Sequence, residues 1–378
     1  MLKYNITPMA TLFHWDLPQN LQDLGGFANP LIVEWFDDYA RVAYELFGDR
    51  VKHWITFNEP FQICYLGYGS TGLAPMLNAT GVGDYLCAKN LVMAHARAYR
   101  TYCDEFKASQ GGECGITISV PAYEPVTYSD RDRLATELQK QSEVSDWAIY
   151  AEPIFSEEGG FPKELYELVA KKSAEQGFSR SRLPDFTDEE KALTRGSSDF
   201  FGVNHYMGNY VYANDKPTDV TVPSLGDDIG SPGVHTPSVW IESTSGPLFV
   251  SNYFIYIQTR YNNPKMYITE NGLFTEGTNY IEDEERAQFY RGALESVLDC
   301  IDAGVNIKGY MAWSLMDNYE WAQGYTKRFG LYEVDFESPA RTRTPRKSAF
   351  VYKQVVKTRV IDHDYEPETR VMTIDEGH

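Results

Sequence analysis

Six short apolar runs alternate along this sequence with stretches of helical periodicity, and this alternation constrains the fold more than any other feature. Each run has the length and the β-branched or aromatic content of a buried strand. The six runs cover residues 6–15, 51–57, 113–120, 198–206, 265–269 and 307–315. Strands that alternate with helices build a parallel sheet, which either stays open and doubly wound or closes into a barrel.

The residues that follow the runs favour the barrel. No Gly-x-Gly-x-x-Gly fingerprint follows any run, and candidate functional residues follow several runs rather than one. A TIM-type (β/α)8 barrel collects such residues at the carboxyl ends of its strands. We therefore expect an α/β barrel and treat residues 1–378 as a single domain. The helices expected between the runs cover 30–47, 84–106, 131–150, 249–261, 282–303 and 349–356, with one or two more in 155–193.

Composition and charge exclude several classes of protein. Lys and Arg number 34 against 54 Asp and Glu, and the net charge of −20 argues against nucleic acid and anionic membranes as partners. The sequence contains no run of 18 apolar residues, the length needed to span a bilayer, and its first residues lack the apolar core of a signal peptide. The five cysteines lack metal-ligand spacing, so we expect buried thiols and no metal. A Cys103–Cys114 disulfide is the alternative if the protein is exported.

A dense polar and aromatic cluster follows the last run. Its members are Trp313, Ser314, Asp317, Asn318, Glu320 and Trp321. Indole rings suit the apolar C–H faces of a sugar, and carboxylates suit its hydroxyls. The competing interpretation is a buried strand followed by a solvated acidic loop, because polar strand ends in α/β proteins are often not functional.

Two glutamates define the candidate chemistry. Glu59 follows the second run between Asn58 and Pro60, and Glu270 follows the fifth run. Two carboxylates facing each other across a barrel mouth suit glycoside hydrolysis, in which one is the general acid and the other the nucleophile. Metal binding is the competing use of such acids, and the sequence has neither His-x-x-x-His nor Asp-x-Asp spacing for it.

At this point several motifs resemble those of glycoside hydrolase family 1, the β-glucosidase family. Residues 56–60 (Thr-Phe-Asn-Glu-Pro) and 267–272 (Tyr-Ile-Thr-Glu-Asn-Gly) are similar to its two catalytic signatures. Residues 14–19, 204–206 and 313–331 resemble further family segments in the same order. The likeness covers nearly the whole chain, and it implies a (β/α)8 barrel enzyme without a cofactor.

The resemblance also implies roles for individual residues. Glu59 would be the acid/base and Glu270 the nucleophile of a retaining enzyme. Asn58 would hold the sugar 2-hydroxyl, Tyr206 would hydrogen bond to the nucleophile, and Glu320 would bridge the hydroxyls at C4 and C6. A core tyrosine without a catalytic role is the alternative for Tyr206, and Asn204 is expected to support the site. The substrate-binding set is His14, Asn58, Tyr206, Trp313, Glu320, Trp321 and Phe329.

The expected substrate is a terminal β-D-glucoside, with galactosides and fucosides as further candidates. Plant thioglucosidases of the family replace the acid/base glutamate, whereas this chain keeps Glu59. The 6-phospho-β-glycosidases replace the Glu-Trp pair that this chain keeps as Glu320-Trp321. A thioglucosidase and an inactive sugar-binding relative remain alternative functions. The oligomeric state remains open, with a homodimer as one candidate. Aglycone preference is expected to lie in the loop 212–246, a functional rim or lid.

The resemblance further implies that the chain begins just before the third barrel strand of the family. We expect two strands to be missing, with a glycone-binding Gln and an Arg beside the nucleophile. The polypeptide as written is then expected to be poorly soluble or inactive, since open sheet edges expose core. The full-length protein is expected to be secreted. Asn78-Ala79-Thr80 is a glycosylation sequon, and Asn5-Ile6-Thr7 is a poorer one because it lies in an expected strand.

Overall fold

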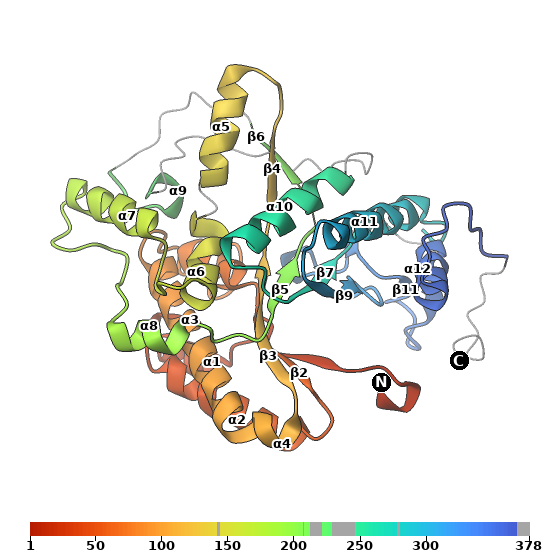
Figure 1. Ribbon diagram of the computed structural model, residues 1–378, viewed down its shortest axis with the longest axis horizontal. Helices are drawn as coiled ribbons and strands as arrows, with labels where there is room; N and C mark the ends of the chain where they lie inside the picture. The colour runs from red at the N-terminus through yellow and green to blue at the C-terminus, as the bar shows by residue number, and fades with distance from the viewer. Residues whose placement is uncertain (142–143, 207, 212–220, 229–245, 278–279, 369–378) are drawn as a thin grey trace. The chain divides into compact units, whose positions relative to one another are not determined.

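The structure is a computed structural model that describes residues 1–141, 144–206, 208–211, 221–228, 246–277 and 280–368 (Figure 1). The chain divides into two compact units. The first unit comprises Met1–Asn204, Asn209–Ser238 and Pro264–Tyr267. The second unit comprises His205–Gly208, Val239–Asn263 and Ile268–His378.

All six apolar runs contain strands of one sheet, as the sequence predicts. The strands are β1 (Met9–Phe13), β2 (His53–Asn58), β3 (Glu113–Ser119), β5 (Phe201–Asn204), β7 (Met266–Asn271) and β9 (Ile307–Ala312), hydrogen bonded in this order. In the first unit β1, β2, β3 and β5 are parallel, with Met9 opposite His53 and Ile116 opposite Phe201. Parallel strands bring their carboxyl ends to one edge of the sheet, and candidate site residues follow these ends.

Helices of the first unit pack beside its strands (Figure 1). The long helix α2 buries Ile32, Phe36, Ala40 and Tyr44, a spacing of four residues that gives one apolar face. That helix contacts α3, most of which is buried. The helices of this unit are α1 (Gln19–Asp23), α2 (Ile32–Phe47), α3 (Gly83–Thr101), α4 (Lys107–Gln110), α5 (Asp130–Gln141), α6 (Ile149–Phe155), α7 (Lys163–Glu175), α8 (Asp188–Thr194) and α9 (Leu225–Asp228).

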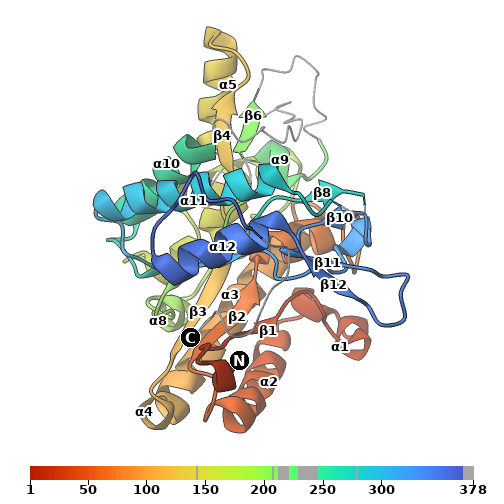
Figure 2. The ribbon, with the colours of Figure 1, turned by 90° about the vertical axis from the view of Figure 1, so that its right-hand side faces the viewer.

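The second unit contains three helices among its described residues: α10 (Gly246–Arg260), α11 (Glu284–Asp302) and α12 (Lys347–Thr358). Helix α11 packs against both α10 and α12, and Figure 2 shows α11 and α12 side by side. Short antiparallel pairs join β8 (Thr275–Glu276) to β10 (Lys327–Arg328), and β11 (Tyr332–Val334) to β12 (Arg343–Pro345). Within the described residues, no helix is long and apolar enough to cross a membrane.

Three local predictions differ from the structure. The expected strand 6–15 begins only at Met9, because residues 2–4 form a 3-10 turn. The expected helix 131–150 contains a π-helical turn, Val144–Ala148, directly before α6, and its residues 142–143 lie outside the described residues. The strand pair β4 (Ala122–Pro125) and β6 (Gly208–Val211) was not predicted. The loop 212–246 lies largely outside the described residues.

The cysteine pairing also corrects the sequence prediction. Cys64 and Cys87 form a disulfide, whereas Cys103, Cys114 and Cys300 are free thiols. The proposed Cys103–Cys114 pair is therefore wrong. Cys64 lies in a π-helical segment, Gln62–Gly69, that packs against α3, and this tertiary contact brings it to Cys87. Cys114 lies buried in β3, where its sulfur contacts the Tyr44 hydroxyl at 3.6 Å.

Candidate active site

Glu59 lies directly after β2 and is 7% exposed. Its backbone N–H donates to the carbonyl of Thr117 on β3 at 2.9 Å, and its φ of 49° is in the left-handed region. A residue other than glycine rarely adopts this conformation, and such strain concentrates at functional positions. The Nδ2 of Asn204, at the end of β5, donates to Glu59 Oε1 at 2.8 Å. This bond favours the ionised carboxylate.

Asn58 connects Glu59 to the end of β1. Its Oδ1 accepts from Asn204 Nδ2 at 3.0 Å, and its Nδ2 lies 3.1 Å from His14 Nε2. The indole N–H of Trp15 donates to the Asn58 carbonyl at 2.9 Å. We call these five residues, His14, Trp15, Asn58, Glu59 and Asn204, the Glu59 cluster. It gathers His14, Asn58 and Glu59, which the sequence predicts for the site, and Asn204, which the sequence predicts as a supporting residue.

The protonation state of His14 sets the direction of its bond to Asn58. Burial lowers the pKa of His14 below its ordinary value, although the charge of Asp16 opposes this shift. The imidazole is therefore neutral at pH 7. Its Nε2 then accepts a hydrogen bond from Asn58 Nδ2, which leaves the proton on Nδ1.

Glu270 is the penultimate residue of β7 in the second unit and is 8% exposed. The Tyr206 hydroxyl donates to Glu270 Oε2 at 2.5 Å. The backbone N–H of His205 donates to the Glu270 carbonyl at 3.0 Å, and Asn271 Nδ2 returns a bond to the His205 carbonyl. The contact that the sequence predicts between Tyr206 and Glu270 is thus present.

Trp313 follows β9, and its backbone is fixed from two sides. Its N–H donates to the Asn271 carbonyl at 2.8 Å, and its own carbonyl accepts from the Tyr290 hydroxyl at 3.1 Å. A Cβ added at Gly272 would lie 1.9 Å from the Trp313 carbonyl oxygen, so only glycine permits this close approach. Tyr206 packs its ring edge-on against Phe329, 5.6 Å between centroids. We call Tyr206, Glu270, Asn271, Trp313 and Phe329 the Glu270 cluster.

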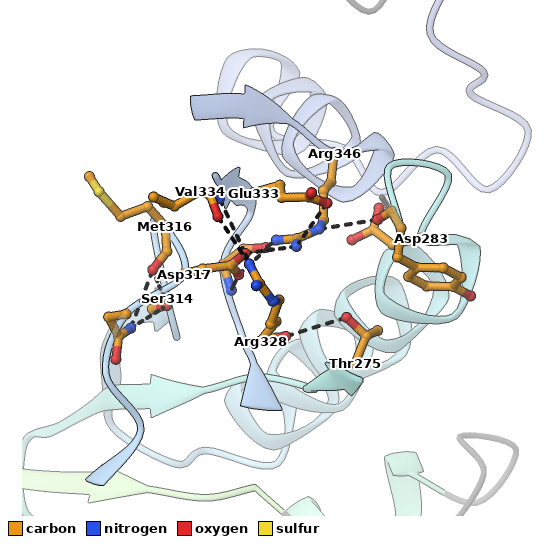
Figure 3. Close-up of polar contacts among 12 residues, drawn as sticks. Thr275, Asp283, Ser314, Met316, Asp317, Arg328, Glu333, Val334 and Arg346 are labelled. Carbon is orange, nitrogen blue, oxygen red and sulfur yellow. Dashed lines mark hydrogen bonds and ion pairs between the residues drawn. The ribbon is translucent and has the colours of Figure 1, made fainter. Parts of the chain in front are cut away.

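Asp317 is the centre of a buried ionic network in the second unit (Figure 3). Arg346 donates to both of its oxygens, at 2.8 and 2.9 Å, and Arg328 donates to Oδ2 at 3.2 Å. The backbone N–H groups of Gly330 and Val334 complete the set at 3.0 and 3.2 Å. Burial alone would raise the pKa of Asp317, but the bonds and charge of Arg346 outweigh it and lower the pKa. We call Asp317, Arg328 and Arg346 the Asp317 network.

A second buried ion pair supports the same segment. Arg286 on α11 pairs with Asp283 at 2.5 Å and donates to the carbonyls of Leu273, Arg328 and Gly330. Asp283 also accepts from the N–H and hydroxyl of Ser348 on α12. Residues on both sides of Phe329 are therefore held by guanidinium groups.

Glu320 and Trp321 lie in the loop between Asp317 and Arg328. Both are half-buried, and the Glu320 N–H donates to the Gly324 carbonyl at 2.7 Å. Burial raises the pKa of the Glu320 carboxyl. Trp321 has a φ of 44°, a second left-handed residue at a predicted site position. Among the residues that the structure describes, no three His, Cys, Asp or Glu side chains form a metal site.

Sequence reasoning missed several supporting residues. Trp15, Asn271 and Arg328 lie inside the family-like segments but were given no role, although each bonds to a predicted site residue or to Asp317. Arg346, which bonds to Asp317, lies outside all of these segments. Asp317 itself was grouped with the sugar-facing residues, but its two oxygens are occupied by guanidinium and backbone donors. The arginine partners of Asp317 are distant from it in the sequence, so only the folded structure identifies them.

Comparison with known proteins identifies the family. The sequence profile described as Glycosyl hydrolase family 1 matches residues 1–361. Myrosinase 1 of Brevicoryne brassicae is 36% identical over 95% of this chain and 76% of its own length. The cytosolic beta-glucosidase of Homo sapiens is 36% identical over 96% of this chain and 77% of its own length.

A solved structure supports the same assignment. Aphid myrosinase superposes with a TM-score of 0.83 at 36% identity, covering 94% of this chain and 76% of that chain. The TIM-barrel fold class and the enzyme class that the sequence predicts are thereby confirmed. This chain is a glycoside hydrolase and belongs to glycosyl hydrolase family 1.

Proposed function

We propose that this protein is a retaining β-glycosidase that removes a terminal, unphosphorylated β-D-glucosyl residue from an O-glycoside. The observation that carries this proposal is a pair of buried glutamates at strand ends. Each glutamate accepts a hydrogen bond from a neutral side chain. Asn204 donates to Glu59 and Tyr206 donates to Glu270, and these donors are two positions apart in the chain. One short segment thus serves both carboxylates, which supports their acting on a single glycosidic bond.

The proposed reaction has two displacements. In the first, protonated Glu59 gives its proton to the glycosidic oxygen while a Glu270 oxygen attacks the anomeric carbon, and the aglycone leaves as an alcohol. In the second, the Glu59 carboxylate takes a proton from water, whose oxygen displaces Glu270 from the anomeric carbon. The β configuration is retained. Retention requires the two carboxyl groups to lie about 5 Å apart.

The hydrogen bonds around the glutamates fit these two roles. Tyr206 donates to Oε2 of Glu270, which stabilises the carboxylate that must attack as an anion. Asn204 donates to Oε1 of Glu59 through a neutral amide, which orients the carboxyl and permits both of its protonation states. One neutral donor therefore supports the proposed nucleophile and another supports the proposed acid/base.

The glycone is proposed to bind the remaining predicted residues. Neutral His14 and Asn58 offer hydrogen bonds to hydroxyls, Trp313 and Phe329 offer apolar surface, and Trp321 lies beside Glu320 in the loop. Glu320 is proposed to accept bonds from the hydroxyls at C4 and C6. A phosphate at C6 would bring negative charge to this carboxylate, so unphosphorylated glucosides, galactosides and fucosides are favoured.

A thioglucosidase is the second candidate, because the relative Myrosinase 1 bears a name of that class. A stable thiolate leaving group requires little protonation, whereas an alkoxide leaving group depends on a general acid. The presence of Glu59, with its oriented carboxyl, supports O-glycosides. Parallel kcat/KM measurements on an aryl O-glucoside and the matching S-glucoside decide between them.

The decisive experiment combines hydrolysis with azide rescue. Nitrophenyl β-glucoside, β-galactoside and β-fucoside are assayed with this chain and with the chain extended by the two amino-terminal strands that the family resemblance implies. In the Glu270→Ala variant, azide should attack the anomeric carbon directly and give the α-glycosyl azide. In Glu59→Ala, azide should displace Glu270 and give the β-glycosyl azide.

Each outcome has a distinct meaning. The two anomers in the expected variants would establish the two roles, and exchanged anomers would reverse them. Binding of glycosides without turnover in either form would instead favour an inactive sugar-binding relative. Glu270→Gln serves as the matched control, because it retains the shape of the side chain without its charge.

We also propose that the protein is exported. The Cys64–Cys87 disulfide supports this, because such bonds persist in oxidising compartments. The name of the human cytosolic relative shows that export does not follow from the family alone. Three free thiols in protein from its natural source would support export, and five would contradict it.

A further inference from the structure

The segment between the two disulfide-bonded cysteines contains a glycosylation sequon that the proposed catalytic reaction does not use. Cys64 and Cys87 enclose Asn78-Ala79-Thr80. We propose that Asn78 carries an N-linked glycan. This inference rests on the proposed export and is independent of the proposed hydrolysis.

The chemistry requires a lipid-diphosphate-linked oligosaccharide as co-reactant. The amide nitrogen of Asn78 forms a bond to the anomeric carbon of the oligosaccharide and loses one proton. The bond between that carbon and the diphosphate oxygen breaks, and the lipid diphosphate leaves. No electron transfer is involved, and the donor belongs to the same compartment in which disulfides form.

The folded chain has room for a glycan at Asn78. The Asn78 side chain is exposed, and its backbone has a φ of 53°. The N–H groups of Leu77, Asn78 and Ala79 donate to the carbonyls of Gly67, Ser70 and Tyr68 at 3.0, 3.2 and 2.9 Å. The turn is therefore held through its backbone, so a substituent on the Asn78 side chain leaves these bonds intact.

Thr80 shows when the transfer must occur. In the folded chain its hydroxyl donates to Asp84 Oδ2 at 3.3 Å and accepts from the N–H of Leu225 at 3.1 Å. Asp84 also accepts from the Gly81 N–H at 2.9 Å, which fixes the backbone just after the sequon. The sequon is therefore locked into the folded turn. Transfer to Asn78 is expected to precede this locking, and we also place it before closure of the Cys64–Cys87 loop that encloses the turn.

The second sequon provides an internal comparison. Residues 5–7 are also exposed and precede β1, so the structure removes the expectation that Asn5 is shielded in a strand. Exposure thus does not distinguish Asn5 from Asn78. The disulfide indicates the compartment of the whole chain and so supports transfer at either sequon. What distinguishes Asn78 is its turn, in which backbone bonds of residues 77–79 leave the side chain outside.

The test directs the full chain into the secretory pathway of cultured eukaryotic cells behind a secretion leader. The pooled intracellular and secreted protein is treated with peptide N-glycosidase and analysed by gel shift and peptide mass spectrometry. We expect the wild-type chain to shift and Asn78 to be converted to Asp by the enzyme. Asn78→Gln and Asn78→Asp should both abolish the Asn78 signal, whereas Thr80→Ser, which keeps the hydroxyl, should retain it.

Two results would overturn the inference. One is an unmodified Asn78 in a chain that carries the Cys64–Cys87 disulfide, which would leave export standing. The other is a gel shift that is lost in Asn5→Gln alone. The order of events is tested by replacing both Cys64 and Cys87 with Ser, which should keep or raise the occupancy of Asn78. A fall in occupancy would show that loop closure comes first.

Discussion

Glu59 and Asp317 are both buried carboxylates in segments that follow strands, but the described side-chain donors to the two differ in charge. Glu59 accepts a bond from the neutral amide of Asn204, whereas Asp317 faces the guanidinium groups of Arg346 and Arg328. A neutral donor orients a carboxyl and permits it to bind a proton, while two cations hold it ionised. Similar burial thus fits the proposed proton transfer at Glu59 and a permanently ionised, structural carboxylate at Asp317.

The first prediction separates the two carboxylates by activity. Glu59→Gln should lower kcat/KM for a glucoside with a poor leaving group by about 10²–10⁴-fold, because the general acid is lost. Thermal unfolding should change little, since the amide keeps the shape of the side chain. Steady-state kinetics and a melting curve check both parts. An aryl glucoside with an activated leaving group is the control and should suffer much less.

The second prediction reverses the pattern at Asp317. Asp317→Asn should lower the free energy of unfolding by about 3–5 kcal/mol, because the buried guanidinium groups of Arg346 and Arg328 lose the carboxylate that they share. Of the ion pairs that the described residues form, Arg346 then keeps only the longer one, with Glu333. Asp335→Asn is the matched control, since Asp335 is exposed in the same unit. Denaturant unfolding measures both. Equal losses in the two variants would mean that the Asp317 network contributes no special stability.

A third prediction follows from the lowered pKa of Asp317. Its ordinary value is 3.8 and the folded value is lower, so near that pH the unfolded chain binds the proton more readily. The stabilisation is therefore complete above about pH 5 and is lost as the pH falls through the folded pKa. The difference in stability between wild type and Asp317→Asn should shrink in acid. A constant difference from pH 7 down to acid would contradict this linkage.

The fourth prediction concerns Tyr206. Removing its hydroxyl in Tyr206→Phe should lower kcat about 10–100-fold, since a hydrogen bond to a charged group contributes about 1.5–3 kcal/mol. Loss of this donor also raises the pKa of Glu270, so the acid limb of the kcat/KM profile should move to higher pH. A purely structural tyrosine would change stability without moving that limb.

The smallest effect is expected at Asn204. Asn204→Ser shortens the donor to Glu59 and should raise the pKa of that carboxyl, moving the alkaline limb of kcat/KM to higher pH. The change in rate at the optimum should be about tenfold or less. Tyr206→Phe should leave this limb in place, so the two pH profiles together assign one donor to each glutamate. Movement of the same limb in both variants would defeat that assignment.

The sequence predicted the strands well, because each buried parallel strand is a short apolar run that needs no knowledge of its neighbours. It predicted the contact of Tyr206 with Glu270 through a family motif and not through physics. The π-helical turn Val144–Ala148 and the Cys64–Cys87 bond were missed, and the bond depends on packing between two separate helical segments. The sequence placed Asp317 in a cluster that suited either a sugar site or a solvated acidic loop, and only the fold reveals its pairing with Arg346.

The tripeptide from Asn204 to Tyr206 has a consequence for how this enzyme can change over generations. Surface loops accept insertions and deletions. Inserting or deleting one residue at His205 would change the spacing between Asn204 and Tyr206, so at most one of these donors could stay in place on its glutamate. A length change in this segment is therefore expected to cost more activity than replacement of either donor alone. A library of single-codon insertions and deletions screened for glycoside hydrolysis should show a sharp gap at these three positions.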